Sequence, residues 1–394
     1  MSSRGRVAVV GGSLGGLTAA LLLRDIGFDV TVYERSVHAM EQRGAGLGFL
    51  PDASRYFTER CGVDIDAIST STPVIRYLDR DGSVSHERDF RYHYSSWFTL
   101  YGILRDRFGT ERYLTGQEAT GFDQDDDSVR VRFSDGSTVE ADLLVCADGV
   151  QSVLRRQLLP DSVRSYSGYV AWRGMVPESD LDAEVVARLG DAITYAFEAN
   201  SHILVYPIPS PTGSVTPGER LINTVWYRNY REGGDLDDLM TDAQGHRHDP
   251  TLPPGAARPE HVAEMRAHAI ARLPAVVAEA VVRCEDPFVQ AVYDLGVERM
   301  AFGRACLIGD AAFVMRPHAA AGTAKAAANA WALADALERH ASIPDALAAW
   351  EPEQLRIGRE LVARTQRLGR ASQVDGTWTA PTDDTLFRLR DEGP

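Results

Sequence analysis

The sequence predicts an α/β fold in which a Rossmann-like dinucleotide-binding domain is joined to a second domain built on an antiparallel β-sheet. A Gly-rich segment at residues 11–16 follows an apolar run at residues 6–10. The pairs at residues 148–149 (Asp-Gly) and 309–310 (Gly-Asp) also follow apolar runs, and aromatic and β-branched residues are frequent in residues 169–292. Because doubly wound sheets bind ligands at the carboxyl ends of their strands, three motifs in such positions predict one shared site.

The composition is that of a globular enzyme. The 394 residues are enough for two packed cores, and 44% hydrophobic and 25% charged residues are ordinary values. The net charge of −15 disfavours nucleic acid and anionic membranes as partners. The four cysteines form no Cys-x-x-Cys pair, so neither a metal site nor a disulfide framework is indicated. We expect a cytoplasmic protein and leave a homodimer open.

The N-terminal segment is best explained as a βαβ unit. Residues 4–23 place basic residues before an apolar stretch, as a signal peptide does, but the glycines within residues 11–16 interrupt it. The pattern favours a strand at 6–10, a helix at 14–26 and a strand at 30–33. No other segment has the ~20 uninterrupted apolar residues of a membrane span.

Later segments return to the first domain, which is therefore predicted to be discontinuous. A strand pattern at residues 129–133, a turn and a strand at 138–145 lead to Asp148, and a strand at 305–308 leads to Asp310. Long helices follow to about residue 370. The predicted dinucleotide-binding domain comprises residues 1–73, 98–168 and 290–370, and residues 371–394 are predicted to be a C-terminal tail.

The second domain is predicted from a change in composition to segments rich in aromatic and β-branched residues. Strand patterns occur at residues 169–175, 203–208 and 221–227, whereas residues 245–259 look like an irregular loop before a helix at 259–272. This domain is predicted to comprise residues 74–97 and 169–289.

The Gly-rich turn has the residue types that a pyrophosphate requires. Its glycines permit a tight turn and close approach of the backbone to a phosphate placed on the helix N-terminus. Ser13 stands where the usual fingerprint has its second glycine. Glu34, at the end of the second predicted strand, can accept hydrogen bonds from ribose hydroxyls.

The two later motifs are compatible with the same ligand. Asp148 is expected near the pyrophosphate and an incoming nicotinamide, although Asp-Gly is often only a turn. Asp310 could hold the hydroxyls of a sugar-alcohol chain. The helix after Gly322 could stabilise negative charge on a reduced ring through its N-terminus; simple helix packing is the alternative reading of the alanines there.

These motifs resemble those of the class A flavoprotein monooxygenases, the family of para-hydroxybenzoate hydroxylase, over about residues 6–370. Segments at 172–174, 206–209 and 236–242 lie outside the shared flavin motifs and are similar to those of hydroxypyridine hydroxylases in that family. The resemblance implies a GR2-type FAD-binding domain, FAD as cofactor, and NADH or NADPH with O2 as co-substrates.

The resemblance also implies a set of cofactor-binding residues. Phe313 departs from the family, where a histidine is common, and Ala320 and Ala324 replace the usual Gly and Asn, and Tyr101 replaces a common arginine. The implied FAD contacts are Gly11, Ser13, Leu14, Gly16, Glu34, Arg35, Arg43, Gly46, Leu47, Asp148, Asp310, Ala320, Ala321 and Gly322.

The implied substrate is a small, electron-rich, hydroxylated aromatic ring. Such a ring becomes more nucleophilic when a hydroxyl loses its proton, so a His or Tyr is expected as base or proton relay. His318 and Tyr206 are the predicted catalytic residues, with His202 and Tyr227 as further candidates.

The sequence therefore predicts an FAD-dependent monooxygenase that hydroxylates such a ring, with a hydroxypyridine favoured over a phenol. The alternatives are an epoxidation or another oxidation on the same scaffold, and a catalytically silent dinucleotide-binding protein that recognises a partner. A flavin halogenase is disfavoured because no Trp-x-Trp-x-Ile-Pro segment occurs.

Overall fold

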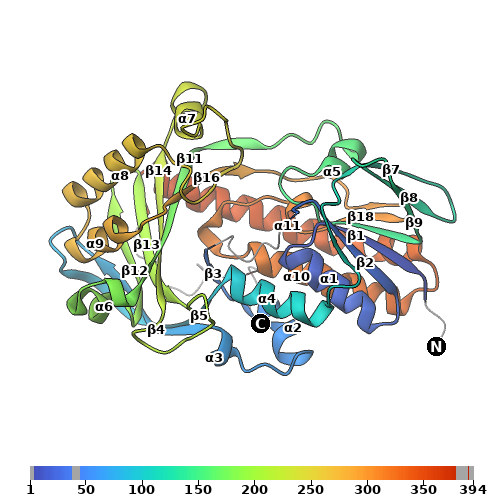
Figure 1. The fold of residues 1–394 in the computed structure, drawn as a ribbon, viewed down its shortest axis with the longest axis horizontal. Coiled ribbons are helices and arrows are strands. Elements are labelled where there is room, and N and C mark those ends of the chain that lie inside the picture. The colour runs from blue at the N-terminus through green and yellow to red at the C-terminus, as the bar shows by residue number, and fades with distance from the viewer. Residues whose placement is uncertain (1–3, 38–44, 379–388, 390–394) are drawn as a thin grey trace.

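The computed structural model describes residues 4–37, 45–378 and 389. The chain forms two lobes, each built on its own large sheet (Figure 1). Helix α11 (Ile343–Gln373) contacts strands of both sheets. The predicted α/β class, with a Rossmann-like part and a second, mainly antiparallel sheet, is confirmed.

The first lobe contains a six-stranded sheet. Neighbouring strands are parallel except for the pair β17 and β18. The central strands β1 and β10 are almost entirely buried, which explains why they read as apolar runs without alternation. The strand order is β17 (Ala301–Phe302), β18 (Ala305–Leu307), β10 (Leu143–Cys146), β1 (Arg6–Val10), β2 (Asp29–Glu34) and β6 (Tyr113–Thr115).

Helices pack around this sheet. α1 contacts α4 and α10, and its residues 16–23 are all buried, as expected of a helix that is apolar on most faces. The other helices of this lobe, α11 aside, are α1 (Leu14–Asp25), α2 (Pro51–Glu59), α3 (Ile65–Ile68), α4 (Trp97–Phe108), α5 (Val153–Leu158) and α10 (Gly322–Arg339).

The second lobe contains a nine-stranded sheet. Its pairs are antiparallel except for β12 with β4. The order is β15 (Thr251–Leu252), β16 (Phe288–Asp294), β11 (Ser165–Pro177), β14 (Leu221–Asn229), β13 (Ser201–Ile208), β12 (Ala192–Glu198), β4 (Thr70–Leu78), β5 (Val84–Ser96) and β3 (Gly46–Gly48). Its helices are α6 (Ala183–Leu189), α7 (Gly234–Leu239), α8 (Pro259–Arg272) and α9 (Ala275–Arg283).

Successive side chains along the strands of this sheet alternate between two faces. One face packs in an apolar core, and the other faces the candidate site. In β11, Val170 and Trp172 join the apolar cluster that includes residues of α8 and α9, whereas Tyr169 and Ala171 belong to the main core on the opposite face. Successive side chains of a strand point to opposite faces. The face turned away from α8 and α9 therefore presents every second residue to the first lobe.

One predicted strand proves to be two. Residues 138–145 divide at Asp142 into β9 (Thr138–Ala141) and β10; β9 pairs with β8 (Val129–Phe133), and β8 with β7 (Ala119–Gln124), in a separate three-stranded sheet. Asp142 accepts the Arg6 N–H at 2.6 Å through its carboxylate and donates its own N–H to the Arg6 carbonyl at 2.8 Å. These bonds hold the corner at which the chain leaves one sheet for the other.

Two further segments differ from expectation. The predicted irregular loop at 245–259 contains the short edge strand β15. Residues 371–378 do not form a loosely attached tail: Ser372 and Gln373 are buried, and the Trp378 ring lies 4.9 Å from that of His202. The predicted domain boundaries stay a prediction.

No described helix is long and apolar enough to cross a membrane. Within residues 4–37, 45–378 and 389, His, Cys, Asp and Glu side chains nowhere gather in a group of three or more that could hold a metal ion.

Gly102 offers a simple test of helix α4. An added Cβ would meet no atom within 4 Å, and the residue does not have a positive φ. Alanine loses less backbone freedom on folding than glycine does. We expect Gly102→Ala to raise the free energy of unfolding by about 0.5–1 kcal/mol, measured by urea denaturation. A lower midpoint at unchanged slope would contradict it.

Candidate active site

The Gly-rich turn between β1 and α1 is sterically closed to larger residues. Gly11 has φ +104°, and a Cβ there would lie 2.2 Å from the carbonyl oxygen of Ala147. A Cβ on Gly16 would lie 1.9 Å from the Gly11 carbonyl oxygen. Ser13, by contrast, has φ −77° and stands just before the helix. A side chain is therefore tolerated where the usual fingerprint has its second glycine.

Glu34 organises this turn. Its two carboxylate oxygens accept the N–H groups of Gly12 and Ser36 at 2.8 and 2.9 Å. On the other side, the hydroxyl of Tyr113 donates to the Gly12 carbonyl at 3.0 Å and lies 3.1 Å from the hydroxyl of Tyr101. Tyr101, which stands in place of the common arginine, therefore supports the turn through Tyr113.

A cavity of about 190 Å³ opens at this edge of the first sheet. Five of the predicted cofactor residues line it: Gly11, Ser13, Glu34, Arg35 and Asp148. Leu14 and Gly16 lie behind them in the first turn of α1. Arg43 lies outside the described residues.

Asp148 is held by the helix that follows it. Its carboxylate accepts the Ser152 hydroxyl at 2.5 Å and the Leu154 N–H at 3.3 Å, and burial raises its pKa. Buried Arg155 donates to the carbonyl of Ala311 at 3.1 Å and so ties this segment to the third motif. Asp148 thus shapes the turn as well as lining the cavity.

The third motif is fixed from helix α10. Asn329 accepts the Gly309 N–H at 3.0 Å, and Gly309 has φ +60°. The ammonium of buried Lys325 lies 3.0 Å from Asp310 and also bonds the carbonyl of Phe313. The Asp310 side chain remains 49% exposed, so one side of the carboxylate is neutralised while the other is available to a ligand.

A second cavity, of about 280 Å³, lies between the two lobes. Its walls come from alternate residues of β11, β13 and β14, from β3, and from the segment before α10. The predicted residues in this lining are Gly46, Leu47, Tyr206, Asp310, His318, Ala320, Ala321 and Gly322, and both further candidates, His202 and Tyr227, are there as well.

The backbone at the edge of this cavity is tightly constrained. Gly46 donates its N–H to Asn223 at 2.9 Å and accepts a bond from Arg173 at 2.5 Å. A Cβ on Gly46 would lie 2.9 Å from the ring of Tyr206. Ala320 has φ +51°, a left-handed conformation that favours glycine. Alanine adopts it here in place of the family's usual residue.

His318 lies in an aromatic cluster. Its Nε2 is 2.6 Å from the hydroxyl of Tyr169, and its buried Nδ1 has no hydrogen-bond partner among the described residues. The rings of Tyr227 and His202 are centred 4.7 and 5.4 Å from it. Burial lowers the pKa of His318 well below its ordinary value.

Tyr206 stacks on Tyr94, with ring centroids 4.4 Å apart. Burial is the main cause that raises its pKa, to about 12, and Arg173 opposes this. His202 bonds Ser372 at 2.5 Å through Nδ1, and burial lowers its pKa to about 3. Burial thus favours the uncharged form of Tyr206, His202 and His318.

Sequence reasoning missed several residues of this cavity. Arg173 and Gln290, which bond each other at 3.0 Å, line it, as do Tyr94 and Tyr195. Arg173 alternates with buried Trp172 along β11, and that period-two pattern was the available signal. Trp378 had no such signal because it follows the last helix.

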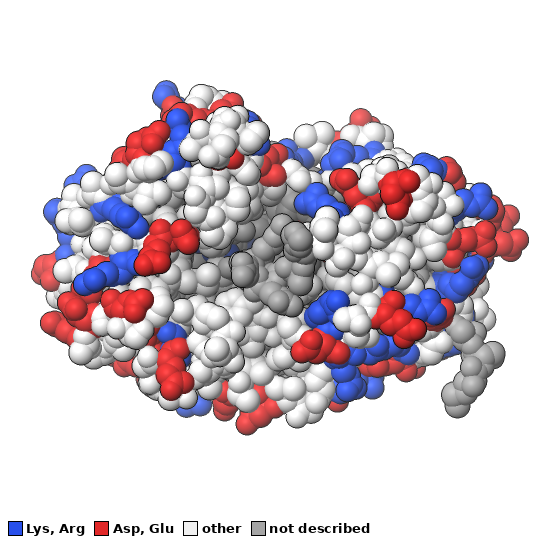
Figure 2. Space-filling view, in the orientation of Figure 1, with Lys and Arg blue, Asp and Glu red and all other residues white. Residues whose placement is uncertain are grey.

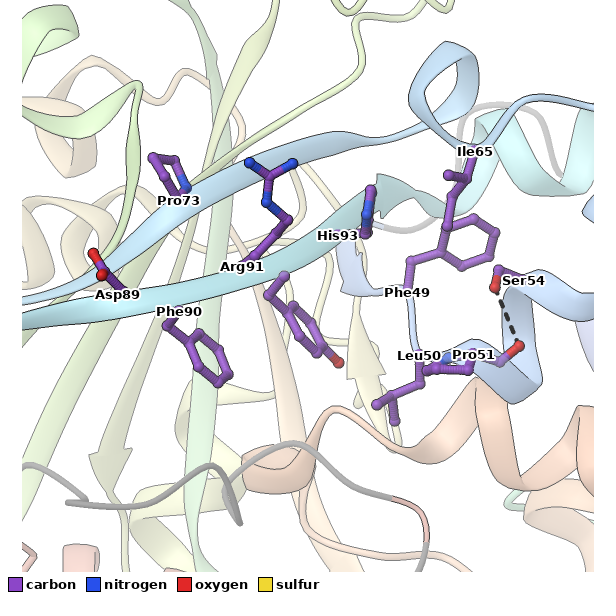
Figure 3. A pocket seen from close by; sticks show the side chains of 11 residues that line it. Phe49, Leu50, Pro51, Ser54, Ile65, Pro73, Asp89, Phe90, Arg91 and His93 are labelled. Carbon is purple, nitrogen blue, oxygen red and sulfur yellow. Dashed lines mark hydrogen bonds between the residues drawn. The ribbon is translucent and has the colours of Figure 1, made fainter. Parts of the chain in front are cut away.

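The outer surface of the molecule carries charged side chains and a second hollow. On the face shown in Figure 2, Lys, Arg, Asp and Glu side chains are interspersed over both lobes. Another, wider hollow of about 740 Å³ lies between α2 and strands β4 and β5, beside Phe90 and His93 (Figure 3). None of the predicted site residues that the structure describes lines this hollow, so the cavity between the lobes is the better candidate active site.

The described residues fit FAD. The glycines that leave no room for a Cβ, the carboxylate of Glu34 and the first turn of α1 suit an adenosine pyrophosphate. Asp310 lies farther along the strand ends, at the edge of the cavity between the lobes. Two family models match: an NAD(P)-binding Rossmann-like domain at residues 9–39 and an FAD binding domain-like model at 166–294. Fold and site thus define a flavin-dependent oxidoreductase.

Comparison with known proteins narrows this class. The chain is 37% identical over 389 residues to 2,6-dihydroxypyridine 3-monooxygenase of Paenarthrobacter nicotinovorans, covering 98% of this chain and 96% of that protein. It belongs to the class A FAD-dependent monooxygenases, the family it resembles. The likeness to hydroxypyridine hydroxylases within this family is confirmed.

Comparison with solved structures supports the same fold. That of 2,6-dihydroxypyridine-3-hydroxylase from Arthrobacter nicotinovorans superposes with a TM-score of 0.93 at 34% identity, covering 100% of both chains. A variant of HpxO from Klebsiella pneumoniae, complexed with FAD, shares the fold with a TM-score of 0.79 at 22% identity over 94% of this chain and 91% of its own.

Proposed function

We propose that this FAD-dependent monooxygenase uses NAD(P)H and O2 to hydroxylate a small hydroxypyridine. The observation that carries the proposal is the cavity between the lobes. It is small, walled by aromatic rings and hydrogen-bond donors, and bordered by Asp310 and the Gly46 segment. The relative of 37% identity is named for hydroxylation of 2,6-dihydroxypyridine.

FAD, when bound, supplies the redox chemistry with NAD(P)H and O2. In this proposal the Gly-rich turn, Glu34 and Arg35 hold its adenosine pyrophosphate half, and Asp310 holds its ribityl chain. Gly46, Leu47 and the segment from Ala320 to Gly322 line its ring. The two lobes exclude water from the cavity between them.

His318 and Tyr206 contact the substrate in this proposal. Both are buried, both line the cavity, and they come from opposite sides of it: Tyr206 from β13 and His318 from the segment before α10. The aromatic walls formed by Tyr94, Tyr195 and Tyr227 orient a flat ring. The division of the chain into an FAD-binding and a substrate domain is part of the same proposal.

The test is a panel of hydroxypyridines and phenols given to the purified yellow holoenzyme with NADH or NADPH. We expect a hydroxypyridine to stimulate coenzyme oxidation and to yield a product heavier by one oxygen atom, labelled when ¹⁸O2 is supplied. A phenol as sole substrate favours phenol hydroxylation. A product without an added ring hydroxyl favours another oxidation, and a protein that does not bind FAD contradicts the proposal.

A further inference from the structure

The cavity between the lobes extends along strand β13. Three residues of that strand that point to one face, Tyr206, Leu204 and His202, line it. Because a strand rises about 3.3 Å per residue, His202 lies about 13 Å along the strand from Tyr206. A Cβ on Gly46, in the segment proposed to line the flavin ring, would lie 2.9 Å from the Tyr206 ring. Tyr206 therefore marks the flavin end of the cavity, and His202 marks its far end.

Aromatic rings surround the far end of the cavity. Trp378 lines the cavity there, and its ring is centred 4.9 Å from that of His202 and 5.5 Å from that of His318. Phe197 of β12, which pairs with His202 across the sheet, has its ring centred 6.5 Å from the same indole. His202 belongs to the sheet of the second lobe, whereas His318 belongs to the segment before α10. The Trp378 ring therefore contacts both walls of the cavity.

The chain reverses direction after α11 and so brings this ring to the cavity. α11 ends at Gln373. The N–H groups of Thr377 and Trp378 both donate to the Ala371 carbonyl, at 2.9 and 3.2 Å. Gly376 has φ +62°, a left-handed conformation that glycine adopts at no steric cost. The turn after the helix therefore directs Trp378 back toward the helix end.

The same turn packs against the second sheet. The Asn229 side chain, at the end of β14, donates to the Gln373 carbonyl at 2.8 Å. A Cβ on Gly376 would lie 3.1 Å from Oδ1 of Asn200, which is in the turn between β12 and β13. The position of Trp378 is therefore fixed by contacts with the strands that form the wall of the cavity.

We propose that Trp378 sets the size limit of the substrate, so that the enzyme accepts a hydroxypyridine of one ring and rejects fused two-ring compounds. This rests on the proposed function and narrows its substrate class. Part of the cavity, which is about 280 Å³ in all, lies beside Gly46 and Asp310, where the flavin ring is proposed to bind. An indole is itself a fused two-ring group, so at the far end it takes the space that a second substrate ring would need. Trp378 is a specificity-determining residue in this scheme, and Gly376 is a positioning residue.

The first measurement is binding to oxidised holoenzyme without NAD(P)H, followed by the flavin absorbance. The one-ring probe is 2,6-dihydroxypyridine. The two-ring probes are 1,3-dihydroxyisoquinoline and 2-hydroxyquinoline, which carry the extra ring on different edges of the pyridine. We expect the wild type to bind each two-ring probe at least about 100-fold more weakly than the one-ring probe, because a filled site gives way only with strain. Equal affinity for one-ring and two-ring probes overturns the proposal.

Trp378→Ala should shift this preference toward the larger probes. We expect Kd for the one-ring probe to rise about tenfold, since an aromatic contact is lost. Kd for at least one two-ring probe should fall at least about tenfold, since space is opened. Thr377→Ala, at the exposed neighbouring position, is the control and should change neither. Damage to the fold would weaken binding of all three probes alike, so a parallel loss, or unchanged ratios of Kd, contradicts the role of Trp378.

Two further variants act on the same ring. Trp378→Phe keeps one aromatic ring and should give Kd values between those of the wild type and Trp378→Ala; it decides the question if the alanine variant does not retain FAD. Gly376→Ala strains the turn at φ +62° and should raise Kd for the one-ring probe about threefold. In a Trp378→Ala background the same change should add nothing, whereas additive effects would show a merely structural role for Gly376.

Product analysis separates this inference from the proposed function. If 2,6-dihydroxypyridine is hydroxylated with NAD(P)H and O2 while the ratios of Kd do not depend on Trp378, only this inference fails. If no hydroxypyridine binds or is hydroxylated, the proposed function fails as well.

Discussion

Gly16→Ala should destabilise the protein by about 3 kcal/mol and abolish FAD binding. The added Cβ would lie 1.9 Å from the carbonyl oxygen of Gly11 and 3.3 Å from the Cβ of Ala147. Both neighbours are in the turns that follow β1 and β10, so α1 can escape the contact only by moving away from the sheet. That movement also withdraws the helix N-terminus from the site proposed for the pyrophosphate.

The measurements are thermal unfolding of the apoprotein and the FAD content of the purified protein. Gly102→Ala is the matched control, because the same change there meets no atom within 4 Å. We expect the control to keep its flavin and gain stability. A Gly16→Ala protein with the flavin content and unfolding temperature of the wild type would contradict the steric account.

If Asp310 holds the ribityl chain as proposed, Asp310→Ala should weaken FAD binding by about 100-fold, because the hydroxyls of that chain would lose a carboxylate acceptor. It should also destabilise the fold, since the ammonium of Lys325, only 1% exposed, would retain only the Phe313 carbonyl among the partners it has in the structure. The two effects must be separated before the loss of flavin is assigned to cofactor binding.

A double variant separates them. Asp310→Ala with Lys325→Met removes the buried charge together with its partner, so apoprotein stability should recover while FAD binding stays weak. Glu338→Ala, at an exposed position near the far end of α10, is the control. FAD is titrated into each apoprotein by fluorescence. Full FAD affinity in the double variant would show that Asp310 serves only to neutralise Lys325.

Local pattern was enough to predict the nucleotide end of the molecule. The βαβ unit forms where an apolar run, a Gly-rich turn and an apolar helix follow one another, and the contacts that require Gly11 and Gly16 are within that unit or one strand away. α8 was predicted with the bounds that the structure has, because its turn residues and composition are local signals. The position of Asp310 after a buried strand is of the same kind.

Contacts between distant segments decided the rest. The division of the predicted strand at Asp142 depends on a hydrogen bond with Arg6, 136 residues away in the chain. The position of Gly46 depends on a hydrogen bond to Asn223, 177 residues away. Such long-range pairings cannot be predicted from the residue pattern of a short sequence segment. The sequence predicted that His318 contacts the substrate, but only the fold brings it to Tyr169, 149 residues away.

By itself, the sequence determined the class of fold, the family and the strand ends that meet at the proposed cofactor site, because each of these depends on short-range patterning of apolar residues and glycine. The tertiary structure decided the chemistry of the cavity. Period-two alternation in β11 turns Arg173 toward the first lobe, and burial lowers the pKa of His318. The direction of the Arg173 side chain and the pKa of His318 both depend on which distant segments pack against them. A local sequence pattern does not predict that packing.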